Sequence, residues 1–159
     1  MTNNDIVYVK SASDCTLVVN VPHIPLIKTW KKRGTKFPIK RLDLIQAYYD
    51  PGVEALFKKG LLVTDDKEFL IAVGLMDEEG QMDIVELTDS YMARLIKNMP
   101  LAEFKIEIKK LSAPQIDELT TYAIFHYTDL SMDRIDILSK LSRRDIMKSI
   151  ANHRAAQEG

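Results

Sequence analysis

Histidine, cysteine and clustered carboxylates are the side chains of this sequence most able to do chemistry, and none forms a catalytic or metal-binding pattern. The histidines, His23, His126 and His153, are far apart in the chain. None of them has a second ligand at a spacing such as i,i+4 on a helix. The single cysteine, Cys15, precedes an apolar run at residues 16–19. That position predicts a small buried core residue rather than a reactive thiol.

The carboxylates cluster in expected turns, at Asp65–Asp66 and Asp77–Glu79. Catalytic acid pairs need an apolar setting that separates their pKa values, and solvated turns lack one. The segment 77–83 does not supply the alternating oxygen ligands of a calcium loop. A nucleophile elbow and a glycine-rich phosphate loop are also absent from the sequence. We therefore expect no catalytic residue, no metal and no small-molecule cofactor, with an enzyme built from scattered residues as the third hypothesis.

The composition is that of a globular protein. The chain has 159 residues, of which 46% are hydrophobic and 28% charged, with a net charge of −1. These fractions are close to average and allow a buried core. The first residues are polar and acidic, and no apolar run approaches the ~20 residues needed to cross a bilayer. We expect a cytoplasmic protein with no membrane partner.

The first half of the chain mixes strands with short helices. A helix is expected from Leu42 to Tyr49, and a second begins at Pro51, with Asp50 as its N-cap, and closes at Gly60. Strands are expected at residues 6–9, 16–21, 61–63, 69–73 and 84–87. We expect the first two to form a hairpin or lie side by side, and the third and fourth to form a second hairpin.

The sequence of the second half of the chain predicts only helices. Apolar residues recur at helical spacing, and Thr88, Ser131 and Ser142 are expected N-caps. Pro100 opens one helix, and Ser112 begins another with a capping box. The expected fold is α+β: residues 1–88 form a mixed or antiparallel sheet with two short helices, 89–155 a bundle of short amphipathic helices, and 156–159 a frayed tail.

Two blocks of opposite charge follow each other in the first half. Residues 28–41 contain seven cations and no acid, and residues 65–89 contain nine acids and one cation. The cations and the aromatic residues among them are Lys28, Trp30, Lys31, Lys32, Arg33, Lys36, Phe37, Lys40 and Arg41. The acidic residues proposed as a partner face are Asp65, Asp66, Glu68, Asp77, Glu78, Glu79 and Asp83. The simplest alternative is that both blocks are solvated loops.

We predict that residues 28–41 form an accessible basic arm that carries Trp30 and Phe37. In the leading hypothesis the arm docks on a protein partner, or on the acidic face of a second copy, so the protein is a non-enzymatic assembly component. In the alternative, the same arm binds phosphates and stacks on bases, as in a small nucleic-acid-binding or regulatory module.

Three segments resemble small uncharacterised proteins of tailed bacteriophages, some of them virion components. The segments are residues 28–34, 48–53 and 59–62, and the resemblance covers about a third of the chain. It implies a capsid, neck or tail accessory protein without enzymatic activity. Under this resemblance the protein would be incorporated into a virion assembled in the cytoplasm.

Overall fold

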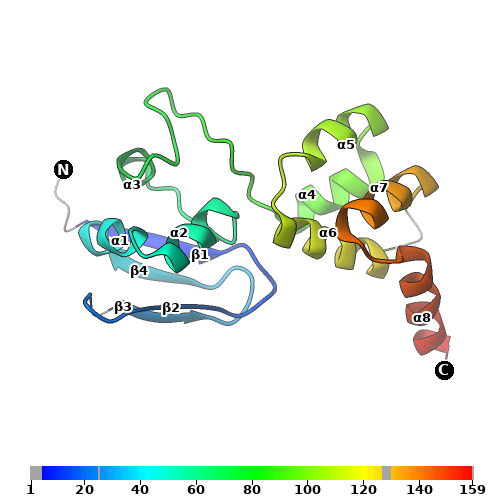
Figure 1. Cartoon of the computed structure of the whole chain (residues 1–159), viewed down its shortest axis with the longest axis horizontal. Coiled ribbons are helices and arrows are strands. Elements are labelled where there is room, and N and C mark those ends of the chain that lie inside the picture. The colour runs from blue at the N-terminus through cyan, green and yellow to red at the C-terminus, as the bar shows by residue number, and fades with distance from the viewer. Residues whose placement is uncertain (1–4, 25, 127–129, 159) are drawn as a thin grey trace. The chain divides into compact units, whose positions relative to one another are not determined.

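The computed structural model describes residues 5–24, 26–126 and 130–158. The chain folds into two compact units, an N-terminal unit of residues 1–86 and a C-terminal unit of residues 87–159. The fold is α+β, with antiparallel sheets in the first unit followed by helices (Figure 1). Each unit has a hydrophobic core of its own.

The main sheet of the N-terminal unit has the strand order β4-β1-β5. Its strands are β1 (Ile6–Ser11), β4 (Lys36–Lys40) and the short β5 (Leu62–Val63). Both neighbours of β1 run antiparallel to it. A separate antiparallel hairpin consists of β2 (Leu17–Val21) and β3 (Leu26–Trp30).

The hairpin packs on the inner side of the main sheet through Trp30. The indole Nε1–H donates a hydrogen bond to the carbonyl of Val9 at 3.0 Å, and the ring meets Phe37 edge-on at 5.3 Å. Only 1% of Trp30 is exposed. A tryptophan that buries its ring and satisfies its N–H contributes strongly to a core.

Three helices complete this unit: α1 (Arg41–Tyr48), α2 (Pro51–Lys58) and α3 (Lys67–Ala72). The expected cap at Asp50 is confirmed, since its side chain accepts from the Gly52 N–H at 2.9 Å. The expected left-handed Gly60 is confirmed by its φ of 73°. Rings from the three helices form an aromatic cluster in the core, Tyr48, Phe57 and Phe69.

Four expectations for this unit are wrong. Strands β1 and β2 do not pair with each other, because β1 pairs with β4 and β2 with β3. The run 69–73 lies mostly in helix α3, which Asp66 caps and which buries two adjacent residues, Phe69 and Leu70. The sequence pattern of a short apolar run does not distinguish a buried helix from a strand. Residues 84–87 are not a strand. Cys15 is exposed and not buried.

The C-terminal unit is helical, as expected. It comprises α4 (Asp89–Ala93), the π-helix η1 (Arg94–Asn98), α5 (Leu101–Ile108), α6 (Ala113–Phe125), α7 (Met132–Ser142) and α8 (Ile146–Glu158). The caps at Thr88 and Ser131 and the capping box at Ser112 are confirmed.

Two details of the helical unit differ from expectation. Asp145, and not Ser142, accepts from the first turn of α8, at the N–H of Lys148. The expected frayed tail is helical as far as Glu158. Arg134 of α7 also donates to the main-chain carbonyls of Leu95 and Met99, and it thereby satisfies acceptors at the end of the π-helix.

Candidate functional site

The exposed side of the main sheet is set by the alternation of β1. Val7, Val9 and Ser11 are buried, so the residues between them point outward. Each outward residue of β1 is paired with an outward residue of β4. We call the resulting surface the outer face, and its members are Ile6, Tyr8, Lys10, Lys36, Pro38 and Lys40.

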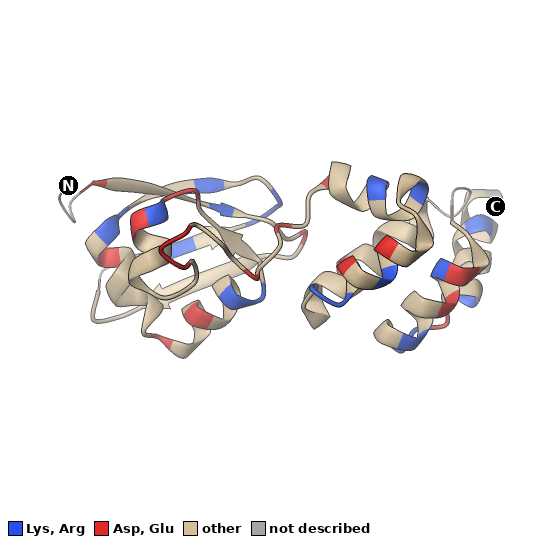
Figure 2. Ribbon diagram, turned by 90° about the horizontal axis from the view of Figure 1, so that it is seen from above, with Lys and Arg blue, Asp and Glu red and all other residues tan. Residues whose placement is uncertain are grey.

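The outer face is an aromatic surface surrounded by lysines. Tyr8 is largely exposed to solvent, with 58% of the residue accessible. The Lys36 Nζ lies over its ring, 5.7 Å from the centroid, in a cation–π arrangement. Lys10 is neutralised by Glu86 at 3.1 Å, whereas Lys40 forms no ion pair with any residue that the structure describes. Figure 2 shows the lysines and arginines, in blue, on the strands of this unit.

Two hollows lie on this surface. The larger is open and has a volume of about 360 Å³. A smaller one of about 110 Å³ lies beside it. Tyr8 and Lys36 line both, and so do Thr64 and Asp65 from the connection between β5 and α3. The site therefore combines an aromatic ring, cations and a carboxylate within one concave surface.

A buried arginine holds the carboxylate side of these hollows in place. The Arg41 side chain is 5% exposed and binds Asp66 in a bidentate pair, with both N···O distances at 2.8 Å. Its Nη1 also contacts Glu68 at 3.1 Å and Asp5 at 3.4 Å. Asp66 in turn accepts from the Phe69 N–H at 2.9 Å and caps α3. One cluster thus fixes the end of β4, the start of α3 and the wall between them.

The charges in this cluster stabilise one another. The hydrogen bond from Arg41 holds the pKa of the Asp66 carboxyl below its ordinary value, and burial opposes that effect only in part. The hydrogen bond to Asp66 likewise raises the pKa of the Arg41 guanidinium. Both shifts favour the ionised forms, so the ion pair between Arg41 and Asp66 is retained near neutral pH.

The basic block does not form the expected arm. Residues 26–30 and 36–40 are strands β3 and β4, which pair with β2 and β1. The expectation that Trp30 is accessible is wrong, because its ring is buried, and Phe37 is half-buried against it. β-Strand alternation turns both rings inward while it turns Lys36 and Lys40 outward.

The remaining cations of the block are divided among several surroundings. Lys31 and Lys32 are exposed in the turn between β3 and β4. Lys28 lies over the Phe37 ring at 5.4 Å, and Arg33 binds Asp14 at 3.0 Å. Arg41 is buried in the cluster described above, so it is unavailable to a partner. Only part of the predicted basic set therefore shares one surface.

The acidic residues are also divided. Asp66 and Glu68 bind Arg41 of the same chain, while Asp65 is exposed beside the outer face. Asp77 organises a turn by accepting from the N–H groups of Glu79 and Gln81. The rest of the acidic set, Glu78, Glu79 and Asp83, is exposed in the segment after α3. Figure 2 shows this segment as a series of red positions.

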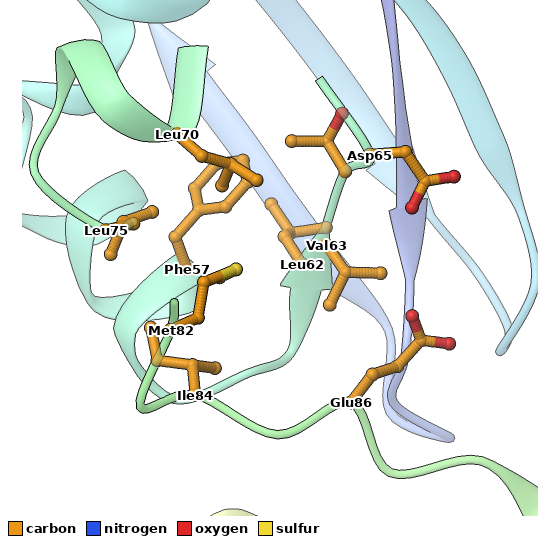
Figure 3. A pocket seen from close by; sticks show the side chains of 10 residues that line it. Phe57, Leu62, Val63, Asp65, Leu70, Leu75, Met82, Ile84 and Glu86 are labelled. Carbon is orange, nitrogen blue, oxygen red and sulfur yellow. The ribbon is translucent and has the colours of Figure 1, made fainter. Parts of the chain in front are cut away.

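An apolar pocket of about 160 Å³ lies between α2, β5 and the segment after α3. Phe57, Leu70 and Leu75 line one part of it, and the carboxylates of Asp65 and Glu86 lie on the side away from Leu75 (Figure 3). Glu86 already binds Lys10. The pocket offers apolar contacts without a nucleophile or a base in a catalytic arrangement.

Within the described part of the chain, no group of three or more His, Cys, Asp or Glu side chains could hold a metal ion. The side chain of His126 contacts the Tyr122 carbonyl at 2.9 Å and stacks on its ring at 4.0 Å, which is a local role at the end of α6. Across residues 5–24, 26–126 and 130–158, no helix is long and apolar enough to cross a membrane.

Tyr8 and Lys10 were missed as candidate site residues by sequence reasoning. The available signal was the alternation in residues 6–11, where apolar Val7 and Val9 separate Ile6, Tyr8 and Lys10. That pattern assigns the three residues to one face of a strand. It cannot identify β4 as the neighbour, because the pairing partner is about 30 residues away in the chain.

Comparisons with known protein families, with curated proteins and with solved structures find no match to this chain. These comparisons assign no function to the chain, and the geometry of its surfaces carries the main evidence. The outer face is the surface that brings the most chemically distinct groups together, namely an exposed phenol ring, lysine ammonium groups and a neighbouring carboxylate.

Proposed function

We propose that this protein is a non-enzymatic docking module that binds a protein partner through its outer face. The observation that carries the proposal is the concave, mixed-charge surface around Tyr8, which places Lys36 and Asp65 on either side of an exposed aromatic ring. Protein interfaces favour an aromatic anchor surrounded by charged groups that set orientation.

The mixture of signs favours a protein over a phosphate backbone. A surface that follows nucleic acid neutralises phosphates with lysine and arginine and excludes carboxylates. Here Asp65 and Asp66 line the same hollow as Lys36 and Tyr8. A protein partner can supply groups of both signs, and the resemblance to phage virion components supports an assembly role inside a particle.

Single-stranded nucleic acid is the second candidate, and one observation favours it. Three lysines surround Tyr8 on one sheet face, and Lys31 and Lys32 are exposed in the turn next to β4. A ring on a sheet face can stack with a base while lysines bind the phosphates. Under this function, the log of affinity falls linearly with the log of salt concentration.

Charge reversal on the outer face tests the proposal. The variant Lys36→Glu with Lys40→Glu should abolish binding of the native partner, because both ammonium groups are exposed on the docking surface. The matched control is Lys105→Glu with Lys109→Glu, which makes the same charge change at exposed positions of the C-terminal unit. Affinity purification of each variant, followed by size-exclusion chromatography with light scattering, reports whether a partner of fixed stoichiometry remains.

The salt dependence distinguishes the two candidates. Light scattering at about 0.05 M and about 0.5 M salt also reveals self-association through charged surfaces. Fluorescence anisotropy with a labelled single-stranded oligonucleotide measures the alternative directly. Tight, salt-sensitive oligonucleotide binding that is lost in Lys36→Glu with Lys40→Glu would replace the protein partner by nucleic acid. If the native partner still binds both the outer-face variant and the control variant, the outer face is refuted as the docking surface.

A further inference from the structure

The hydrogen-bond pattern of β1 leaves one of its edges open. The Arg41 N–H donates to the Asp5 carbonyl at 2.9 Å, and the Ser11 N–H donates to the Thr35 carbonyl at 2.9 Å. In an antiparallel ladder the hydrogen-bonded pairs alternate. Odd-numbered residues of β1 therefore bond to β4, and the main-chain groups of Ile6, Tyr8 and Lys10 face the opposite edge.

Strand β5 covers only the end of this opposite edge. It pairs with β1 at Lys10 and Ser11, and the contact continues as a bond from the Ala12 N–H to the Leu61 carbonyl at 2.8 Å. The chain then leaves the sheet, because Asp66 begins helix α3. In the part of the chain that the structure describes, no main-chain group bonds to Ile6 or Tyr8 on this edge.

The other edge of the sheet is blocked. Pro38 lies opposite Tyr8 in the register of β4 with β1. Because this is a non-hydrogen-bonded pair, the Pro38 nitrogen faces away from β1, toward the outside of the sheet. Proline has no N–H to donate at that position, which is a common protection of an edge strand. The two edges of one sheet thus differ in whether they can accept another strand.

A hollow lies along the open edge. The hollow of about 360 Å³ is lined by Ile6, Val7 and Tyr8 on the β1 side and by Thr64, Asp65 and Asp66 on the other. Its second wall is the segment that follows β5 in the chain. A neighbouring strand lies about 4.8 Å from β1 in the hydrogen-bonding direction. An extended segment placed there would complete the sheet along Ile6 and Tyr8.

Resting on the docking function proposed above, we infer that this edge of β1 accepts an extended, basic peptide segment of the partner protein as an added strand. Main-chain bonds to Ile6 and Tyr8 supply the pairing, as in other strand-addition complexes. A residue opposite Tyr8 shares its outward face, so an aliphatic stem there covers the phenol ring. Its cationic end meets Asp65, which is exposed and forms no ion pair with any described residue.

The same charges disfavour a second copy of this chain as the occupant. Two β1 strands paired across a two-fold axis would each bring a Thr64–Asp66 wall to the shared edge. Asp65 of both copies, which has no ion-pair partner in the described part of the chain, would then lie at one shared edge, and like charges in close contact repel. A basic segment from a different protein has no such conflict.

Nuclear magnetic resonance on the full-length chain tests this inference. The probe is a capped hexapeptide of alternating lysine and valine, and its counterpart carries glutamate in place of lysine. Binding of the lysine peptide should shift the amide resonances of Ile6 and Tyr8 and slow their hydrogen exchange. The glutamate peptide should bind at least about tenfold more weakly. The variant Asp65→Lys should reverse this preference, because it reverses the charge at the wall of the hollow.

Peptides N-methylated at alternate positions provide the decisive control, since the protein stays unchanged. Methylation of the amides that face β1 should weaken binding at least about tenfold, and methylation of the amides that face away should change it less than about twofold. Equal effects of the two patterns, or unshifted Ile6 and Tyr8 amides, would overturn strand addition.

The remaining outcomes separate this inference from the docking function. Peptide binding that ignores the methylation pattern but is lost in Lys36→Glu with Lys40→Glu supports the outer face and overturns strand addition. The second outcome is a clear methylation pattern together with a native partner that still binds Lys36→Glu with Lys40→Glu. This outcome supports the edge of β1 as the binding site and overturns the outer face as the docking surface. Dimerisation without peptide, with protected Ile6 and Tyr8 amides, would identify a second copy as the occupant and overturn the basic peptide.

Discussion

The wall of the candidate site depends on Asp66, and substitutions there give the sharpest test of the structure. Asp66→Asn keeps an oxygen that can cap α3 but removes the charge that neutralises buried Arg41. Breaking a buried ion pair by removing one partner costs 3–5 kcal/mol in general. Glu68 and Asp5 still contact Arg41, so we expect a loss of roughly 3 kcal/mol in the free energy of unfolding, at the low end of that range.

Two further variants separate the contribution of the Asp66 charge from that of the helix cap and of the neighbouring carboxylate. Asp66→Ala also removes the cap, so it should cost about 1 kcal/mol more than Asp66→Asn. Asp65→Ala is the matched control, because it removes the neighbouring carboxylate, which is exposed and forms no ion pair in the described part of the chain. That variant should stay within about 0.5 kcal/mol of the unaltered protein.

Urea denaturation followed by tryptophan fluorescence is the assay. Trp30 is the only tryptophan in the chain and lies in the core of the N-terminal unit, so its emission reports on that unit alone. With a slope of about 1 kcal/mol per M urea for so small a unit, the Asp66→Asn midpoint should fall by roughly 3 M. If Asp66→Asn and Asp65→Ala unfold at the same urea concentration, the reasoning about the Arg41 cluster is refuted.

The remaining predictions concern pH, the core and the second unit. Because the folded pKa of Asp66 lies below its ordinary value of 3.8, its stabilisation should be complete above that value and lost as pH falls through the lowered pKa; acid titration of Asp66→Asn should lack this component. Tyr48→Phe should not destabilise the N-terminal unit in urea, since the buried hydroxyl has no hydrogen-bond partner in the described structure, and a clear loss would show that one exists. Burial, together with the hydrogen bond to Glu107 at 2.8 Å, raises the pKa of Tyr91 to about 12, so ultraviolet titration should find one tyrosine ionising there and Tyr91→Phe should remove it. Acrylamide should quench Trp30 emission weakly in the folded chain and strongly in urea, and strong quenching without urea would contradict its burial.

Local sequence signals determined most of the helices and several of their ends, although helix α3 and the start of α8 were missed. Asp50, Thr88, Ser112 and Ser131 all cap the helices expected from the sequence, because a cap needs only a side-chain oxygen within three residues of the N–H groups it satisfies. The same locality explains Gly60, whose positive φ closes α2. The α+β class follows from these elements and from the β-branched runs, so the sequence alone was sufficient to establish it.

Tertiary structure alone decided which residues form a surface. Charge counts identified residues 28–41 as unusual, but strand pairing divides them: Trp30 and Phe37 turn into the core, Arg41 enters a buried cluster, and Lys36 and Lys40 turn outward beside Tyr8. A net charge or a block of like charges contains no information about register, and a shift of one residue would exchange the two faces. The pairing of β1 with β4 rather than β2, a non-local choice set by burial of the core, is what creates the outer face and leaves one edge of β1 open.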